Sequence, residues 1–168
     1  MATLNKLPVE FYSRHVVDVA KDLLGKRLFF GSFHGIITET EAYRGHDDEA
    51  SHAFRGITKR SEIMFKNPGH AYVYMIYGMY YCLNIVAEME GQAAAVLIRG
   101  VKLPDLHLDG PGKACRHLGI NKEHNGINVI HSDYLYVTDG IEKPNHEVTT
   151  RIGIQKAKEK PWRFVMVP

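Results

Sequence analysis

The sequence contains little cysteine, no long apolar run and almost no net charge, and each shortage disfavours a class of protein. Cys82 and Cys115 are the only cysteines among 168 residues, and they form no C-x-x-C pair. A disulfide framework or a thiolate metal site is therefore not expected, and a reducing cytoplasm is the predicted compartment. No apolar run approaches the length that crosses a bilayer, and the N-terminal stretch lacks the apolar segment of a signal peptide.

The net charge of +2 is too small to indicate a nucleic-acid partner, but the charges are unevenly distributed. Residues 151–163 contain five basic side chains and one acidic side chain, whereas residues 39–62 contain six acidic and four basic ones. A basic segment combined with an acidic one suits a protein that holds a polyanion and acts on it with a carboxylate. A solvated loop rich in lysine explains the same pattern equally well.

The order of apolar and turn-forming residues predicts an α+β fold in a single domain spanning residues 1–168. Strand-like segments are many, helices are few, and the two do not alternate, so we expect a curved, mainly antiparallel sheet with flanking helices and a protruding β-hairpin. The expected helices are Val16–Leu24, with Ser13 as N-cap, and Gly110–Leu118, with a short helix or turn at Ala50–Phe54. The expected strands are Arg27–Phe33, Gly35–Glu41, Ala71–Ile76, Met79–Ala87, Ala93–Val101, Tyr134–Val137, Thr149–Ile154 and Trp162–Val167.

The stretch ETEAY ends one predicted strand with two carboxylates and a tyrosine on alternate positions. Side chains alternate along a strand, so Glu39, Glu41 and Tyr43 are expected to share one face. A carboxylate beside an aromatic ring at the end of a strand is typical of a pocket wall that contains a general base. An exposed edge strand with acidic side chains is the alternative.

The stretch AYVYMIYGMYYCLN contains five tyrosines and is expected to form a hairpin with its tip at Tyr77 and Gly78. Aromatic side chains within strands usually pack in the core, but one at a hairpin tip is exposed to water. Such a side chain serves binding, for example by wedging between stacked bases. Asn84, on the returning strand among apolar neighbours, must satisfy its hydrogen bonds or line a cavity.

Three further groups could contribute to a site. Arg99 ends an apolar run and needs a carboxylate partner, for which Glu41 and Glu39 are the candidates. The GPGK segment at residues 110–113 could hold a phosphate at a helix N-terminus, although it lacks the P-loop spacing. Asp48 and His52 lie four positions apart and could bind a metal on one helix face, but no second cluster supplies further ligands.

These motifs together resemble the alkyladenine (3-methyladenine) DNA glycosylase family, the type without a helix-hairpin-helix motif. The similarity covers nearly the whole chain, and its most specific part is the ordered run ETEAY, EASH and YVYMIYGMYYCLN. Further matches are LLGK, VLIR, GPGKAC, GINK, RIGI and PWRF. The resemblance implies a monofunctional glycosylase that flips alkylated or deaminated purines out of duplex DNA and hydrolyses the N-glycosidic bond.

The resemblance also assigns roles to single residues. Glu41 is expected to be the general base that activates water for attack at C1′ of the sugar, and Arg99 is expected to position that water and hold Glu41. Tyr77 is expected to enter the minor groove and fill the gap that the flipped base leaves. Met64 is expected to touch DNA near that gap.

The remaining matches form the slot for the flipped base. Tyr43 is expected to stack on one face of the base, with His52 and Tyr74 on the other side and edge. Asn84 matches the position that disfavours guanine by crowding its amino group, and Ile152 matches an apolar position of the pocket. The motifs do not distinguish between alkylated purines, hypoxanthine and etheno adducts as the preferred lesion.

The resemblance implies no metal or organic cofactor, with water as the nucleophile and no lysine placed for a Schiff base. The expected partner is double-stranded DNA containing damaged purines, with no membrane, and the expected protein is a bacterial monomer. Family members are expected to continue beyond the position of Pro168 into another strand, and His46–Asp48 is expected to be a solvated loop. Two alternatives stay open, a non-catalytic module that binds damaged DNA and a metal-dependent hydrolase using Asp48 and His52.

Overall fold

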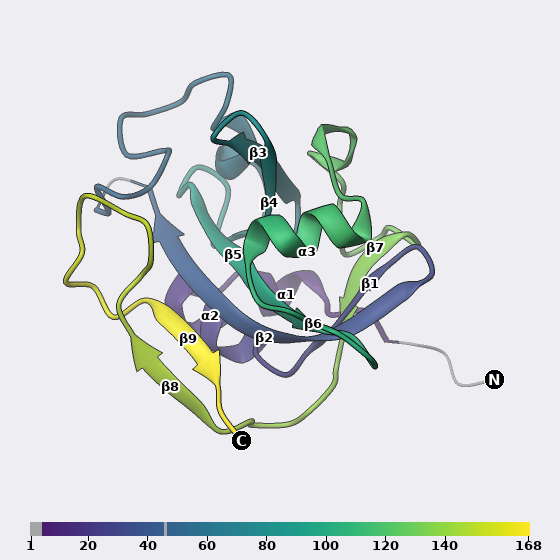
Figure 1. Cartoon of the computed structure of the whole chain (residues 1–168). Coiled ribbons are helices and arrows are strands. Elements are labelled where there is room, and N and C mark those ends of the chain that lie inside the picture. Colours follow the sequence, from purple (N-terminus) through teal and green to yellow (C-terminus); the bar gives the residue numbers. More distant parts are fainter. Residues whose placement is uncertain (1–4, 46) are drawn as a thin grey trace.

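A computed structural model describes residues 5–45 and 47–168 (Figure 1). Within these residues, nine strands form one sheet that is antiparallel at every pairing, which confirms the predicted α+β class. The strands are β1 (Arg27–Phe30), β2 (Phe33–Arg44), β3 (Ala71–Ile76), β4 (Tyr80–Ala87), β5 (Ala94–Lys102), β6 (His107–Leu108), β7 (Leu135–Thr138), β8 (His146–Thr149) and β9 (Arg163–Met166).

The long strand β2 organises the sheet. Residues Ile36–Arg44 of this strand pair with β5 on one side, in the strand order β3-β4-β5-β2-β1-β7. On the other side β1 pairs with the first residues of β2 and β9 pairs with Glu39–Glu41, so two strands share one edge. Register shifts in the β2–β5 pairing at Ile37–Thr40 mark a bulge, which increases the local twist and bends the strand. The bend divides this edge of β2 into one part that pairs with β1 and another part that pairs with β9.

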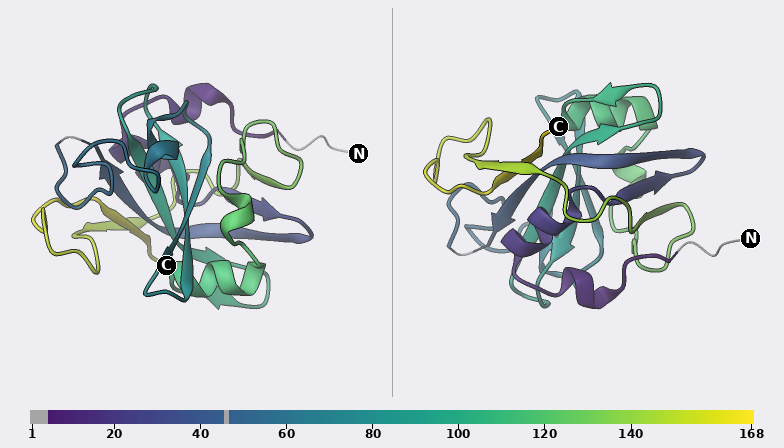
Figure 2. Two further views of the ribbon diagram at one scale, coloured as in Figure 1. Left: turned by 90° about the horizontal axis from the view of Figure 1, so that it is seen from above. Right: turned by 90° about the horizontal axis from the view of Figure 1, so that it is seen from below.

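Helices cover both sides of the curved sheet. The helices α1 (Val9–Tyr12) and α2 (Val16–Leu23) lie on one side and α3 (Pro111–Leu118) on the other, as the two turned views agree (Figure 2). Helix α2 turns Val16, Val19, Ala20 and Leu23 inward, and all four are fully buried. None of the helices in the described ranges is both long and apolar enough to pass through a bilayer.

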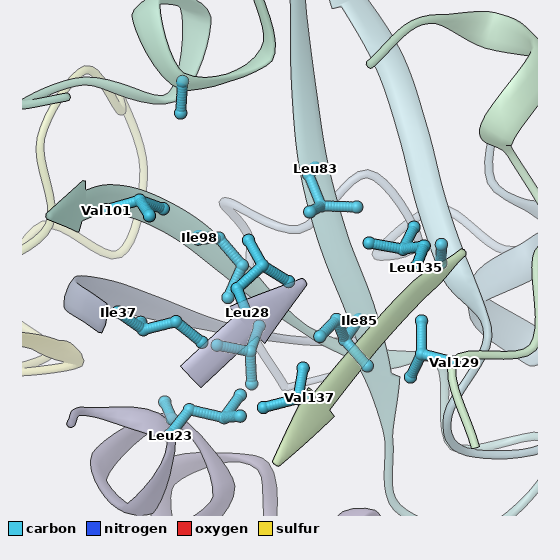
Figure 3. Close-up of a cluster of buried hydrophobic side chains, with 14 of the residues drawn as sticks. Leu23, Leu28, Ile37, Leu83, Ile85, Ile98, Val101, Val129, Leu135 and Val137 are labelled. Atoms are coloured by element: carbon cyan, nitrogen blue, oxygen red, sulfur yellow. The ribbon is translucent and has the colours of Figure 1, made fainter. Parts of the chain in front are cut away.

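The main hydrophobic core contains side chains of the helices and of strands on both sides of β2 (Figure 3). Leu23 of α2, Leu28 of β1, Ile98 of β5 and Val137 of β7 are among its buried members. Burying one such aliphatic side chain contributes about 1.5–3 kcal/mol, so this core supplies much of the force that fixes the sheet. The core explains why the strand predictions in the apolar runs succeeded.

The hairpin of β3 and β4 turns at Tyr77 and Gly78, as the sequence predicts. Both residues have positive φ angles, 52° at Tyr77 and 65° at Gly78, which is the geometry of a two-residue turn that follows the strand twist. Glycine adopts this conformation freely, whereas tyrosine rarely does. The side chain of Tyr77 is 82% exposed, so an aromatic residue in a strained conformation projects from the tip into solvent.

Several predicted boundaries are wrong. Ser13 does not cap α2: it follows α1 and its hydroxyl donates to the carbonyl oxygen of Val9, the first residue of α1, while the His15 side chain accepts from the Val17 N–H instead. Residues 50–54 form turns, which is one of the two forms expected there. Only Thr149 of the predicted Thr149–Ile154 strand belongs to a strand, β8, and the following residues leave the sheet as a loop. That departure places Ile152 where it can face the end of β2.

Candidate active site

A cavity of about 630 Å³ opens beside the ends of β2, β3, β4 and β5. One wall consists of strand side chains, and the other consists of two loops, at residues 49–52 and 152–156, and the start of α3 at residues 110–113. Seven of the predicted site residues line the cavity directly: Tyr43, His52, Met64, Tyr74, Asn84, Arg99 and Ile152. Tyr77 lines its rim, and Glu41 lies behind the wall in contact with three of these residues.

The carboxylate of Glu41 is fully buried, with 0% of the residue exposed. Its Oε1 accepts a hydrogen bond from the Tyr43 hydroxyl at 2.8 Å, and its Oε2 accepts one from the Ile152 backbone N–H at 2.7 Å. The Nη1 atom of Arg99 lies 3.6 Å from Oε1. Burial of a carboxylate is costly unless hydrogen bonds and an opposite charge compensate it, and this site provides both. The exposed edge strand considered as an alternative is therefore excluded for Glu41.

Glu39 supports the site from the neighbouring position. Its Oε2 atom accepts from the Nε atoms of Arg99, at 3.0 Å, and of Arg163, at 2.8 Å. Arg99 therefore spans both carboxylates of the ETEAY stretch, which confirms that Glu39 and Glu41 share a face. The hydrogen bond from Arg99 Nε to Glu39 fixes the arginine side chain. Its Nη1 atom then lies toward Glu41.

Tyr43 combines a hydrogen-bond donor with a flat ring on the cavity wall. Burial, together with the nearby Glu41 carboxylate, raises the pKa of Tyr43 well above its usual value, so its hydroxyl stays protonated and donates to Glu41. The Arg151 guanidinium lies over one face of the Tyr43 ring, 4.8 Å from its centre. The Tyr43 ring is thus held from its edge and from one face.

His52 and Tyr74 lie against each other, with ring centroids 4.4 Å apart and planes at 74°. His52 Nδ1 also lies 2.9 Å from the Tyr72 hydroxyl. Partial burial of the imidazole, and secondarily the charge of Arg60, lowers the pKa of His52 to about 4. The imidazole is therefore neutral at neutral pH, and this wall of the cavity carries aromatic rings without a positive charge on His52.

Asn84, Met64 and Ile152 complete the lining in different ways. Asn84 is buried in β4 and its amide donates to the Tyr72 carbonyl oxygen at 3.2 Å, which fixes the side chain while it faces the cavity. Met64 is 2% exposed and packs in a second apolar cluster with Tyr72 and Val86, so a contact with DNA at this residue stays a prediction. Ile152 is 46% exposed in its loop and forms part of the rim.

The GPGK segment joins the site, although its predicted role remains open. Gly110–Lys113 line the cavity at the start of α3, where Gly110 is the N-cap. The exposed Lys113 ammonium forms an ion pair with Asp109 at 2.8 Å. An exposed pair of this kind is weak and leaves the lysine available to other anions.

The sequence reasoning missed one completely buried ion pair near the site. The solvated loop expected at His46–Asp48 is wrong for Asp48, while His46 lies outside the described residues. The Asp48 side chain is completely buried and forms an ion pair with Arg151, whose side chain is also completely buried. No local pattern could have revealed this pair, because the two residues are 103 positions apart. The excess of basic residues at positions 151–163 was the one sequence signal that included Arg151.

Asp48 is not free to bind a metal. Its two oxygens accept from Arg151 at 2.6 and 2.8 Å, and also from the backbone N–H groups of Arg44 and Ala50. Throughout residues 5–45 and 47–168, no three histidine, cysteine, aspartate or glutamate side chains are grouped as metal ligands would be. The pairing of Asp48 and His52 as ligands is therefore not supported by the geometry.

The arrangement suits a reaction in which a planar, polar molecule enters an aromatic slot and reaches a carboxylate that lies behind one wall of the slot. The Tyr43 and Tyr74 rings offer electron-rich faces, which attract cationic or electron-poor rings. Behind them Glu41 can accept a proton from water, and Arg99 can hold both Glu41 and that water. The slot is open to solvent at a rim that carries Tyr77 and Lys113.

The chain was compared with known protein families and with curated proteins. The family model of methylpurine-DNA glycosylase matches residues 10–167. A protein of Wolbachia pipientis subsp. Culex pipiens (strain wPip) is 55% identical over 161 residues, which cover 94% of this chain and 88% of that protein. A protein of Rickettsia felis is 51% identical over 170 residues, which cover 99% and 96%. Both relatives bear the provisional name 3-methyladenine DNA glycosylase.

Proposed function

The chain belongs to the methylpurine-DNA glycosylase family, and from this premise we propose that it is a monofunctional DNA glycosylase. In this proposal it flips alkylated or deaminated purines out of double-stranded DNA and hydrolyses the N-glycosidic bond, the first step of base excision repair. The observation that carries the proposal is the buried Glu41 carboxylate directly behind the wall of an aromatic cavity, held by Tyr43, Ile152 and Arg99.

The reaction follows from the positions of these groups. Tyr43 stacks on one face of the flipped base, and His52 and Tyr74 contact the other side. Glu41 takes a proton from water as the water attacks C1′, and its negative charge stabilises the oxocarbenium-like transition state. The bond between C1′ and the base nitrogen breaks, and its electron pair leaves with the purine. Arg99 keeps Glu41 and the water in place.

The electrostatics of the slot favour alkylated purines. Methylation at a ring nitrogen makes the base cationic, and a cation is attracted to the faces of tyrosine rings. A protonated histidine would repel such a base, but the lowered pKa of His52, about 4, keeps its imidazole neutral under physiological conditions. Asn84 is fixed by its hydrogen bond to the Tyr72 carbonyl and lines the cavity. In this proposal it crowds the exocyclic amino group of a normal guanine.

Tyr77 would take the place of the flipped base in the duplex. It lies at the tip of the β3–β4 hairpin, is 82% exposed, and is held in a conformation that tyrosine rarely adopts. An exposed ring presented in this way can enter a base stack and recover some of its hydrophobic free energy there. We propose that the protein acts as a monomer in a bacterial cytoplasm, with water as nucleophile and no cofactor.

The test is base release from short duplexes that each contain one hypoxanthine, ethenoadenine or methylated purine. Hot alkali converts each abasic site to a strand break, and the same duplexes without damage serve as controls. We expect release from at least one lesion, unaffected by a chelator. Binding of damaged duplex without release would make the chain a recognition module, and loss of release with the chelator would favour a metal-dependent hydrolase.

A further inference from the structure

The buried ion pair of Asp48 and Arg151 has no part in the proposed reaction, yet it lies directly behind the site. We propose that this pair is a positioning device that assembles the loop wall of the cavity and thereby sets the contact between Ile152 and Glu41. The inference rests on the proposed glycosylase function and adds two positioning residues to it. Neither residue lines the cavity.

Arg151 connects three segments of the chain. Its Nη1 donates to Asp48 at 2.6 Å and to the Ala42 carbonyl oxygen at 3.0 Å, between Glu41 and Tyr43 on β2. Its Nη2 donates to Asp48 at 2.8 Å and to the Ala157 carbonyl oxygen at 3.1 Å, which closes the loop that carries Ile152. One guanidinium therefore fixes the end of β2, the segment at residue 48 and the loop 151–157 relative to one another.

The guanidinium is also enclosed between two aromatic rings. It lies 4.8 Å from the Tyr43 ring centre and 5.2 Å from the Trp162 ring centre. Its plane and charge thus support the wall side of Tyr43, the residue proposed to stack on the flipped base. Within the described part of the chain, Nε is the one guanidinium nitrogen of Arg151 that has no hydrogen-bond partner. The other two nitrogens hold the group in place.

Asp48 extends the same connection toward His52. Its carboxylate accepts from the backbone N–H groups of Arg44 and Ala50, and its own carbonyl oxygen accepts from the Ser51 N–H. These hydrogen bonds shape the turns that precede His52, since residues 48–54 contain no helix or strand. The pair therefore joins the loops of His52 and Ile152, the two proposed slot residues that lie outside regular secondary structure.

Position matters here because Ile152 contacts Glu41 through its backbone. The Ile152 N–H lies one residue after Arg151 and donates to Glu41 at 2.7 Å. If Arg151 shifted, this N–H would move with it, and Glu41 would lose a donor that orients Oε2. A displacement of about 1 Å at a reacting group can lower a rate on the order of 100-fold.

The pair is costly to bury, and a purely structural purpose would be served as well by apolar side chains of similar volume. A bidentate contact offers something that apolar packing does not, namely a fixed orientation. Nearby, Arg44 and Glu88 form a comparable bidentate pair, with distances of 2.9–3.1 Å. The other side-chain hydrogen bonds of this pair go to Asp47 and to the Val16 N–H, and not to Glu41, Tyr43 or the loop 151–157. That pair provides a matched control.

The experiment compares Asp48→Asn, Arg151→Lys and Arg44→Gln with the wild type on a duplex with one damaged purine. For each protein we would measure the excision rate constant at saturating enzyme and the Kd for the same duplex with a tetrahydrofuran abasic analogue. We expect the Asp48 and Arg151 variants to lose rate on the order of 100-fold, with Kd changed less than about threefold. Arg44→Gln should lower the Tm but alter neither quantity by more than about threefold.

Arg151→Lys keeps a positive charge beside Asp48, so we expect this variant to fold even if Asp48→Asn does not. It removes the hydrogen bonds to Ala42 and Ala157. A wild-type rate in a folded Arg151→Lys protein would overturn the inference. So would a rate that falls in step with Kd, or an equal loss in Arg44→Gln. If the wild type releases no base from any lesion, the proposed function fails instead, which separates the two conclusions.

Discussion

The two walls of the cavity are built in different ways. Tyr43, Tyr74 and Asn84 stand on strands, where each pairs with a residue of a neighbouring strand. Arg99 stands on β5 at the bulge opposite Glu39 and Thr40. His52 and Ile152 stand on loops, where side-chain contacts take over that role. A strand positions a side chain through its register, whereas these loops depend on one buried ion pair. The comparison predicts that changes in the two walls have different consequences.

The largest effect is expected on the strand wall, at Glu41. Glu41→Gln keeps the size of the side chain but removes the proton acceptor, so excision should fall about 10²–10⁴-fold, the range typical of a lost general base. Glu39→Gln, two residues earlier on the same strand, is the matched control and should lose far less, since Glu39 contacts only arginines. Single-turnover rates of the two variants test this difference; equal losses would assign the chemistry elsewhere.

The next effect separates the two walls without any assay of activity. Amide hydrogen exchange, followed by NMR or mass spectrometry, should be much faster at Ile152 than at Leu97 and Ile98 of β5, which lie in the middle of the sheet. Asp48→Asn should increase exchange at Ile152 on the order of tenfold or more and leave β5 unchanged. Equal acceleration in both places would mean that the pair stabilises the whole domain and not the loop wall.

A smaller effect is expected from the Tyr43 hydroxyl. Tyr43→Phe keeps the ring that faces the base and removes one hydrogen bond to Glu41. Because a hydrogen bond to a charged group contributes about 1.5–3 kcal/mol, the rate should fall about tenfold to a hundredfold. Affinity for damaged duplex should stay the same, and a titration of binding beside the rate measurement would check this. A loss of affinity would indicate that the hydroxyl itself contacts the base.

The smallest effect concerns the charge of His52. Its pKa is lowered from 6.5 to about 4 in the folded protein, so the unfolded chain takes up the proton first as the pH falls. The contribution of this group to stability is therefore complete above pH 6.5 and is lost as the pH falls toward 4. An NMR titration of the imidazole, with His52→Gln to assign its signals, should show no protonation at pH 6. Protonation near pH 6.5 would mean that the slot is more hydrated than the structure indicates.

The strand wall could be predicted from the sequence because strand periodicity is local. Alternation places Glu39, Glu41 and Tyr43 on one face, and the five tyrosines mark the hairpin and its tip. The loop wall could not be predicted, since Asp48 and Arg151 meet across 103 positions and carry no periodic signal. An acidic run such as HDDE usually lies in solvent, so the burial of Asp48 becomes evident only once the fold brings Arg151 to it.

The same limit explains the misplaced strand at Thr149–Ile154. Its alternating apolar residues fit a strand pattern, but the tertiary contacts of Arg151 turn the chain away from β8 and toward Asp48. A pattern of period two reports which residues could pair in a sheet, not whether a partner strand is present. The motif resemblance, which carries information from whole proteins, did identify Ile152 as part of the pocket, and Ile152 does line the cavity.

In the proposed complex a flipped purine occupies the cavity between Tyr43 and the pair of His52 and Tyr74. The most direct measurement is the position of the damaged base in a crystal structure of the Glu41→Gln variant bound to a duplex containing hypoxanthine. We expect this base to lie between those rings, with its C1′ beside residue 41 and Tyr77 in the gap of the stack. A base that stays paired within the duplex, with the cavity empty, would contradict it.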